Sequence, residues 1–289
     1  MKYLKKFEKQ IEYDKFKNSP LYIEPNVSLI SENNGKMMYN KKSDNKILSF
    51  SLNKPGDKDT ASIALKFSGK TPDAIIEYSY DGIKWTTYKT FGDYLSINIK
   101  DPKVFFRGNN PTQFSSDTTY YYYFDMKSDS NSQIFAEGDV TSLLNGVGGD
   151  YSLKPVKPNV FCNLFAGCSI MATAPNLPST ILIDGCYYGI FKECTSLKES
   201  PILPAETLAK SCYELMFYGC TSLAKITALF VIDPKDINSY ATDWAKKLPN
   251  DGNLCKNNKL TLNDTSEILL PATWKIEDYS PKNETHKEL

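Results

Sequence analysis

Apolar and polar side chains alternate in several short runs between residues 45 and 135. An alternation of period two places one set of side chains in a core and the other in solvent, which is the pattern of half-buried β-strands. Asp81-Gly82 separates two of the runs, and we expect a tight hairpin there because both residues tolerate positive φ angles. Short strands at this spacing predict a small β-sandwich. The expected strands are residues 47–52, 61–67, 75–80, 83–88, 95–99, 104–106 and 118–124, with 128–132 as a surface loop.

Five aromatic residues follow one another from Tyr120 to Phe124. As a binding platform they would stack on sugar rings, and as a strand they would face the core and the solvent in turn. We favour the strand, because aromatic residues are enriched in strands whether or not a ligand is bound.

A different period governs the second half of the chain. Phenylalanine recurs with an equal spacing of twenty-six positions at Phe165, Phe191 and Phe217, and a cysteine stands three positions beyond each of them. A period of about 20–29 residues with fixed apolar positions is typical of a leucine-rich solenoid, whose coils bury their apolar side chains only by stacking. The expected repeat core consists of Phe165, Cys168, Met171, Leu177, Cys186, Phe191, Cys194, Leu197, Leu203, Cys212, Phe217, Cys220, Leu223 and Leu229.

The recurring cysteines admit three interpretations. They are buried as small apolar side chains, they bind a metal, or one of them is a nucleophile. We favour burial, because a column of thiols lines up along a row and does not surround a point, and because the only histidine, His286, lies in a polar tail. No cofactor or metal is expected.

Caps are expected at both ends of the repeats. Residues 138–149 would join the sandwich to the first coil, and the glycines within them lack the Lys-Ser or Lys-Thr of a phosphate-binding loop. After Leu229 the repeat register is expected to fail. Residues 236–248 have helical spacing and would cover the last coil, with 271–274 as the closing strand.

Residues 1–18 have an amphipathic helical pattern that is followed by two prolines and an extended segment, closed by Asn33-Asn34-Gly35. Such an arm is too short to build its own core, so we expect it to be ordered by docking on a partner. The expected anchoring residues are Tyr3, Leu4, Phe7, Ile11, Tyr13, Phe16, Pro25, Asn26 and Val27.

The fold class is therefore mainly β with a minor α component. We expect an N-terminal anchoring arm (1–44), a β-sandwich (45–135), a repeat domain with caps (136–279) and a flexible tail (280–289).

Charge and composition limit the classes of binding partner that we expect. Lys plus Arg and Asp plus Glu both total 34, so no net field attracts nucleic acid or an anionic membrane, and proteins or glycans are the expected partners. No apolar run reaches the length of a membrane span, and residues 1–8 lack the apolar core of a secretion signal. Seven cysteines without a C-x-x-C pair indicate free thiols in a reducing compartment.

The motif Cys-Tyr-x-x-x-Phe-x-x-Cys-Thr-Ser-Leu, at 186–197 and 212–223, resembles the BspA-type leucine-rich repeats of surface proteins of gut Bacteroidetes and their phages. Residues 76–86 and 138–144 resemble the small β-domain and the junction that often precede such repeats. The resemblance covers about residues 70 to 276. The opening residues 2–7 and 24–29 are similar to the start of virion proteins of crAss-like phages, although Glu24 stands where that pattern has leucine.

This resemblance implies a non-catalytic virion protein, such as a head fibre or a tail-associated fibre, assembled in the host cytoplasm. Its arm would bind capsid or tail proteins, it would form a homo-oligomer, often a trimer in such fibres, and its repeats would meet a host-surface protein or glycan. A bacterial cell-surface adhesin is the alternative that the repeats support equally. A glycan hydrolase would need two facing carboxylates, and no motif singles out such a pair.

Overall fold

The protein consists of two compact units, residues 1–46 and residues 47–289. The computed structural model describes residues 29–33, 36–39, 46–52, 58–69, 73–130, 132–149, 153 and 156–280. In the first unit, β1 (Leu29–Asn33) pairs antiparallel with β2 (Lys36–Tyr39). The helix expected over residues 1–18 and all nine anchoring residues lie outside the described residues. Within these limits the protein is mainly β, as the alternation predicts.

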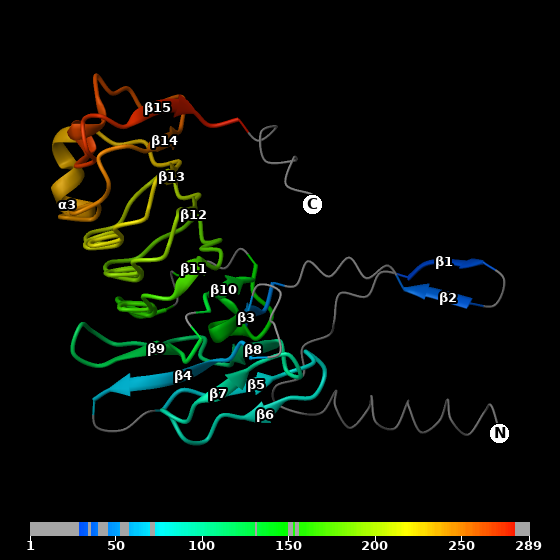
Figure 1. The fold of residues 1–289 in the computed structure, drawn as a ribbon. Helices are drawn as coiled ribbons and strands as arrows, with labels where there is room; N and C mark the ends of the chain where they lie inside the picture. Colours follow the sequence, from blue (N-terminus) through cyan, green and yellow to red (C-terminus); the bar gives the residue numbers. More distant parts are fainter. Residues whose placement is uncertain are drawn as a thin grey trace, which may run out of the picture. The chain divides into compact units, whose positions relative to one another are not determined.

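Two sheets pack face to face at the beginning of the second unit (Figure 1). One has the order β11-β10-β3-β8-β5-β6 and the other the order β7-β4-β9. Phe50 of β3 and Phe124 of β9 meet between them, with ring centroids 4.9 Å apart. The bounds are β3 (Leu48–Leu52), β4 (Ala61–Ser68), β5 (Ile76–Ser79), β6 (Thr86–Thr87), β7 (Leu95–Ile97), β8 (Lys103–Gly108), β9 (Tyr121–Ser128), β10 (Ile134–Glu137) and β11 (Met171–Thr173).

The aromatic run is a strand, as predicted, although β9 begins at Tyr121 and not at position 118. Tyr122 and Phe124 are buried, whereas Tyr121 and Tyr123 are partly exposed. Period two therefore places one set of rings in the core and the other on the surface.

The tight hairpin at Asp81-Gly82 is a wrong prediction. Tyr78 pairs with Thr86, so the segment 79–85 connects the paired positions of β5 and β6. The Asp81 carboxylate accepts hydrogen bonds from the amides of Ile83 and Lys84, at 2.8 and 2.7 Å. These local bonds replace the strand ladder that a two-residue turn would need.

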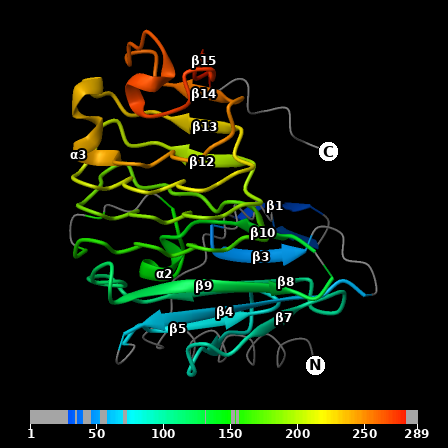
Figure 2. The same cartoon turned by 60° about the vertical axis from the view of Figure 1, so that its left-hand side comes forward.

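Beyond the sandwich, the chain forms a stack of coils in which each turn of the chain adds one strand to a parallel sheet (Figure 2). The sheet contains β12 (Glu199–Leu203), β13 (Lys225–Ala228), β14 (Asn253–Lys256) and β15 (Lys275–Asp278), in that order. The helical segments are short: α2 (Ser142–Asn145), η1 (Pro234–Asp236), α3 (Ile237–Ala241) and η2 (Thr265–Ile268).

Four turn segments, residues 159–167, 185–193, 211–219 and 239–247, form the side of the stack that lies opposite the strands. The amide of Phe165 donates to the carbonyl of Ile190 at 2.9 Å, and that of Phe191 to Met216 at 3.0 Å. Every second residue of the first three segments makes the equivalent bond to the next coil. These inter-coil hydrogen bonds form a ladder that requires tight turns. Within each segment, a residue with a left-handed backbone conformation therefore recurs every four positions. These residues are Asn159, Asn163, Gly167, Gly185, Gly189, Glu193, Ser211, Leu215 and Gly219.

The repeated phenylalanines share one interior column, as expected. Phe165, Phe191 and Phe217 stack with centroids 5.6 and 5.8 Å apart and ring planes within 7° of parallel. Phe124 of β9 continues the column toward the sandwich, 5.4 Å from Phe165. The sandwich therefore supplies the base on which the first coil packs. A second column, which was not predicted from the sequence, consists of Phe161, Tyr187 and Tyr213.

The repeated cysteines are buried and form a ladder of their own. The Cys194 thiol donates to the carbonyl of Phe165 at 3.1 Å. Cys168 and Cys220 donate to the phenylalanine of the preceding layer at 3.2 and 3.0 Å. The carbonyls of Phe165 and Phe191 also accept the amides of Cys168 and Cys194, so each of these oxygens has a second donor in the thiol of the next coil.

Leu229 is the exception among the expected core residues, because it is partly exposed. Leu203 pairs with Ala228, and the register shows one extra residue in β12. A one-residue shift turns each following side chain to the other face of a strand. Phe230 is buried in place of Leu229.

The 26-residue spacing is lost after the third coil, as predicted, but the coils themselves continue. The amide of Phe217 donates to the carbonyl of Trp244 at 2.6 Å, so a further turn segment extends the ladder, and donor and acceptor are 27 positions apart there instead of the 25 positions between Phe191 and Met216. The helix predicted over 236–248 ends at Ala241, because Thr242 adopts an extended ψ of 131°. Trp244 then packs on Phe217, with centroids 6.1 Å apart.

The closing strand is β15, and not residues 271–274 as predicted. The amide of Trp274 donates to the carbonyl of Pro271 at 3.0 Å, which makes this segment a turn. The Trp274 indole donates to the Pro249 carbonyl at 2.8 Å and holds that turn against the stack.

The glycine-rich segment at 146–149 joins the sandwich to the coils. The buried Asp139 carboxylate accepts a hydrogen bond from the amide of Gly149 at 2.7 Å and another from the Asn176 side chain at 3.0 Å. One carboxylate therefore ties the junction to the end of the first coil strand.

Candidate functional site

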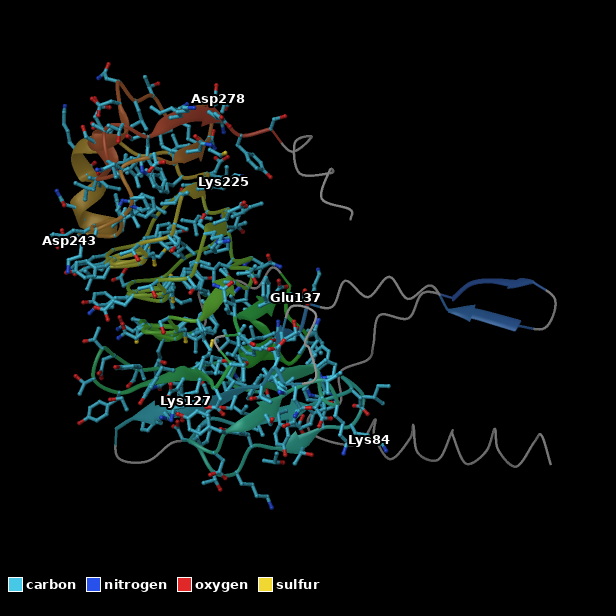
Figure 3. The ribbon with its side chains drawn as sticks, viewed as in Figure 1. Lys84, Lys127, Glu137, Lys225, Asp243 and Asp278 are labelled. Carbon is cyan, nitrogen blue, oxygen red and sulfur yellow. The ribbon has the colours of Figure 1, made fainter. Side chains whose placement is uncertain are left out.

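The coil stack presents two different surfaces. We call the outward face of β12–β15 the strand side, and the outward face of the four turn segments the turn side. Figure 3 shows Lys225 and Asp278 among the strands and Asp243 on the opposite side of the stack. Because every coil contributes to both sides, each surface is built from side chains at repeating positions.

The strand side carries small polar and charged side chains. Lys225 pairs in register with Glu199 on one strand and with Asn253 on the next, and the Lys225 ammonium lies 4.0 Å from the Glu199 carboxylate. The next row on the same face contains Ile202, Thr227, Cys255 and Glu277, of which Thr227 is buried. None of the residues of β12–β15 is aromatic.

The turn side carries tyrosines beside charged groups. Tyr188 and Tyr218 occupy outward positions of successive coils and are partly exposed. The ammonium groups of Lys247 and Lys192 lie 4.8 and 5.8 Å from the centroid of the Tyr218 ring. Partial burial, and then the charge of Glu214, raises the pKa of Tyr188. The Tyr188 phenol therefore stays protonated and keeps an O–H donor at neutral pH.

The outward tyrosines of β9 extend this surface across the sandwich. The rings of Tyr121 and Tyr123 lie 5.7 Å apart. Partial burial raises the pKa of Tyr121, and the neighbouring Tyr123 and Cys162 act in the same direction. Cys162 also raises the pKa of Tyr188. The first coil, which contains Cys162, lies between β9 and the coil of Tyr188, because Phe165 stacks between Phe124 and Phe191.

We call Tyr121, Tyr123, Tyr188 and Tyr218 the tyrosine tract. A polar cluster borders it on the same sheet: the Lys66 ammonium lies 2.5 Å from the Asp125 carboxylate, which also accepts a hydrogen bond from the Tyr94 hydroxyl at 2.6 Å. The hydrogen bond to Asp125 raises the pKa of Lys66. This pairing fixes the long side chains at the edge of the tract.

The expected repeat core residues, apart from Leu229, are all buried and lie between these two surfaces. The expected anchoring residues lie outside the described residues, so their grouping stays a prediction. Tyr188 and Tyr218 were not among the site residues predicted from the sequence. Their signal was the outward position, three positions before and one position after a repeated phenylalanine, within an otherwise apolar motif.

The buried thiols resist ionisation, as side chains in an apolar core do. Burial raises the pKa of Cys162, Cys212 and Cys220 to about 12 and that of Cys194 well above its ordinary value. A thiol becomes a nucleophile as the thiolate, and burial in apolar surroundings opposes that ionisation. In the described part of the chain, no three His, Cys, Asp or Glu side chains gather as a metal-ligand set.

No helix among the described residues has the length and apolar character needed to cross a membrane. Comparison of the chain with models of known protein families, with curated proteins and with solved structures found no match in any of the three.

Proposed function

We propose that this protein is a non-catalytic structural protein of a phage virion, a head fibre or tail-associated fibre that presents a BspA-like leucine-rich-repeat solenoid to the host surface. The stack of coils carries this proposal. Its interior columns of phenylalanine and cysteine build a rigid rod of repeating layers, and its outward positions vary from coil to coil. Repeat scaffolds of this type provide extended binding surfaces.

The division of the chain supports an attachment role for residues 1–44. Residues 1–46 form a unit separate from the coil-bearing unit. In the proposed mechanism, the arm docks on capsid or tail proteins, the sandwich spaces the coils from the particle, and the chain assembles as a homo-oligomer such as a trimer. Seven free cysteines suit assembly in the reducing host cytoplasm.

Purified particles test the proposal. Mass spectrometry of virions from a phage that carries this gene should detect the protein, and electron micrographs of particles that lack the gene should show missing fibres. In the full-length protein, the combined changes Leu4→Asp, Phe7→Asp and Val27→Asp should prevent incorporation. The matched control places Asp at Leu289 in the polar tail and should be incorporated normally. Particles of unchanged composition and appearance without the gene would refute a virion role.

A further inference from the structure

Aromatic side chains are distributed unequally between the two surfaces of the stack. The turn segments expose Tyr188 and Tyr218 and the adjoining face of β9 exposes Tyr121 and Tyr123, whereas β12–β15 contain no aromatic residue and β10 of the sandwich adds one partly exposed ring, Phe135. Tyrosine is enriched at binding surfaces, because its rigid ring provides contact area with little loss of entropy and its hydroxyl group provides a polar handle. The asymmetry therefore points to the turn side as the surface that meets a ligand.

The backbone of the turn side is already paired. Amides at every second position donate to the next coil, from Asn159 to Gly219. A partner therefore cannot add a strand there, and recognition depends on side chains alone. The turn segments are also held rigid by their neighbours, so the rings are positioned before any ligand arrives.

The charges of the turn side balance. Three lysines and three carboxylates lie in outward positions of the turn segments, and they are Lys192, Lys246, Lys247, Glu193, Glu214 and Asp243. A polyanion such as nucleic acid or a sulfated glycan would meet as many repelling as attracting groups. A neutral ligand rich in hydroxyl groups meets no such penalty, because carboxylates accept its O–H bonds and ammonium groups donate to its oxygens.

The geometry also selects a chain-like ligand. Successive coils repeat at about the 4.8 Å spacing of neighbouring strands. Because Phe124, Phe165, Phe191 and Phe217 stack in that order, Tyr121, Tyr188 and Tyr218 belong to β9, the second coil and the third coil, respectively. A ligand that consists of repeated rings is long enough to span these layers and to contact tyrosines from more than one of them.

We propose that the tyrosine tract binds a neutral polysaccharide, with its sugar rings stacked on Tyr121, Tyr188 and Tyr218 and its hydroxyl groups bonded to Glu214 and neighbouring side chains. This inference rests on the proposed attachment function and assigns its ligand class and its site. No bond is formed or broken, so the interaction is reversible binding.

Affinity electrophoresis of the purified full-length protein tests the proposal. The probes are neutral polysaccharides of different linkage, namely amylopectin, mannan, xylan and a mixed-linkage β-glucan, with heparin and polygalacturonate as anionic probes. We expect at least one neutral probe to retard the protein and the anionic probes to have no such effect. The double variant Tyr121→Ala, Tyr188→Ala should weaken that retardation at least tenfold.

Control variants distinguish a loss of the binding site from a loss of the folded structure. Tyr188→Phe keeps the ring and should retain most of the binding, whereas Glu214→Gln should reduce it less than the loss of the rings. Lys225→Ala and Glu277→Ala, on the strand side, should bind like the unaltered protein, and all variants should unfold at the same temperature.

Three outcomes would overturn the inference: no retardation by any neutral probe, retardation by anionic probes only, or equal loss in the strand-side variants. A protein receptor would produce the first of these. Each outcome leaves the virion role intact, because incorporation into particles is measured independently, and detection of the protein in virions would still stand if no glycan bound.

Discussion

The aromatic rings of the sandwich and those of the coil stack pack by different rules. In the sandwich, Phe106 meets Phe50 at 75° and Phe124 at 74°, the edge-to-face arrangement that isolated ring pairs favour. In the stack, Phe165, Phe191 and Phe217 are parallel within 7°. Repetition explains the difference, because side chains at equivalent positions of equivalent coils adopt the same rotamer. The ring pairs of the stack therefore lack the edge-to-face geometry, but their layers can be repeated without change.

The largest expected effect comes from the middle of the column. Phe191→Ala removes a fully buried ring that contacts Phe165 on one side and Phe217 on the other, and we expect a loss of about 4 kcal/mol in the free energy of unfolding, measured in urea. Lys198→Ala, an exposed position in the same coil, should change it by less than about 0.5 kcal/mol. A loss below about 1 kcal/mol for Phe191→Ala would show that the column is not a continuous core.

Substitution of glycines that have positive φ angles should lower the free energy of unfolding by a smaller amount. Gly185 has a φ of +62° and an added Cβ would collide with the Asn159 side-chain oxygen, whereas Gly167 has a φ of +78° and open space around it. We expect Gly185→Ala to cost about 3 kcal/mol and Gly167→Ala about 1 kcal/mol in thermal or urea unfolding. Combining Gly185→Ala with Asn159→Ala should remove most of the difference. Equal costs for the two glycines would contradict close contact between coils.

The pH dependence of stability due to thiols should belong to the stack alone, because all seven cysteines lie between residues 162 and 255. Burial raises the pKa of Cys220 from 9.0 to about 12. Its contribution is therefore complete below pH 9 and declines as the pH rises toward 12, since the unfolded thiol ionises while the folded thiol stays protonated.

Cys220→Ala isolates this contribution. Between about pH 8 and pH 10 the unaltered protein should lose about 1.4 kcal/mol more than the variant, which is the linkage value for one pKa unit. The two proteins are compared by urea unfolding at each pH. Parallel pH profiles would mean that the thiol is ionised equally in both states.

The smallest effect should be stabilising. Glu193 holds a φ of +61° at a position where neighbouring coils have Gly167 and Gly219. Glu193→Gly should raise the free energy of unfolding by about 0.5–1 kcal/mol, because glycine adopts this conformation without strain. Glu193→Ala, which removes the carboxylate and keeps the strain, should not. A gain in both variants would assign the effect to charge.

The sequence predicted the columns because identical residues recur at an identical spacing, and stacking is the only way for such residues to be buried. It did not predict the fourth turn segment, which lies two positions further along the chain than the repeat requires and packs Trp244, in place of a phenylalanine, on Phe217. Leu229 was misassigned because an extra residue within β12 shifts the register without leaving a trace in the repeat.

The candidate site was less predictable than the core. Tyr121 and Tyr188 belong to different periodic patterns, and they lie on the same stack only because the first coil packs between β9 and the second coil through Phe124, Phe165 and Phe191. The period-two pattern of a strand and the 26-residue repeat of the coils do not indicate, even together, that residues of the two regions share one surface. The alternation did predict that successive rings of this strand would face the core and the solvent in turn, and this is confirmed.

The inter-coil ladder gives the molecule an adjustable length. Residues 186–211 receive hydrogen bonds on one face and donate the same set on the other, so an inserted duplicate of this unit meets both neighbours as the original does. Tandem duplication or deletion of the codons for one such unit would thus lengthen or shorten the rod by one step of about 4.8 Å while both ends are preserved. Such changes would let the reach of the protein evolve in discrete increments, without redesign of its base or its tip.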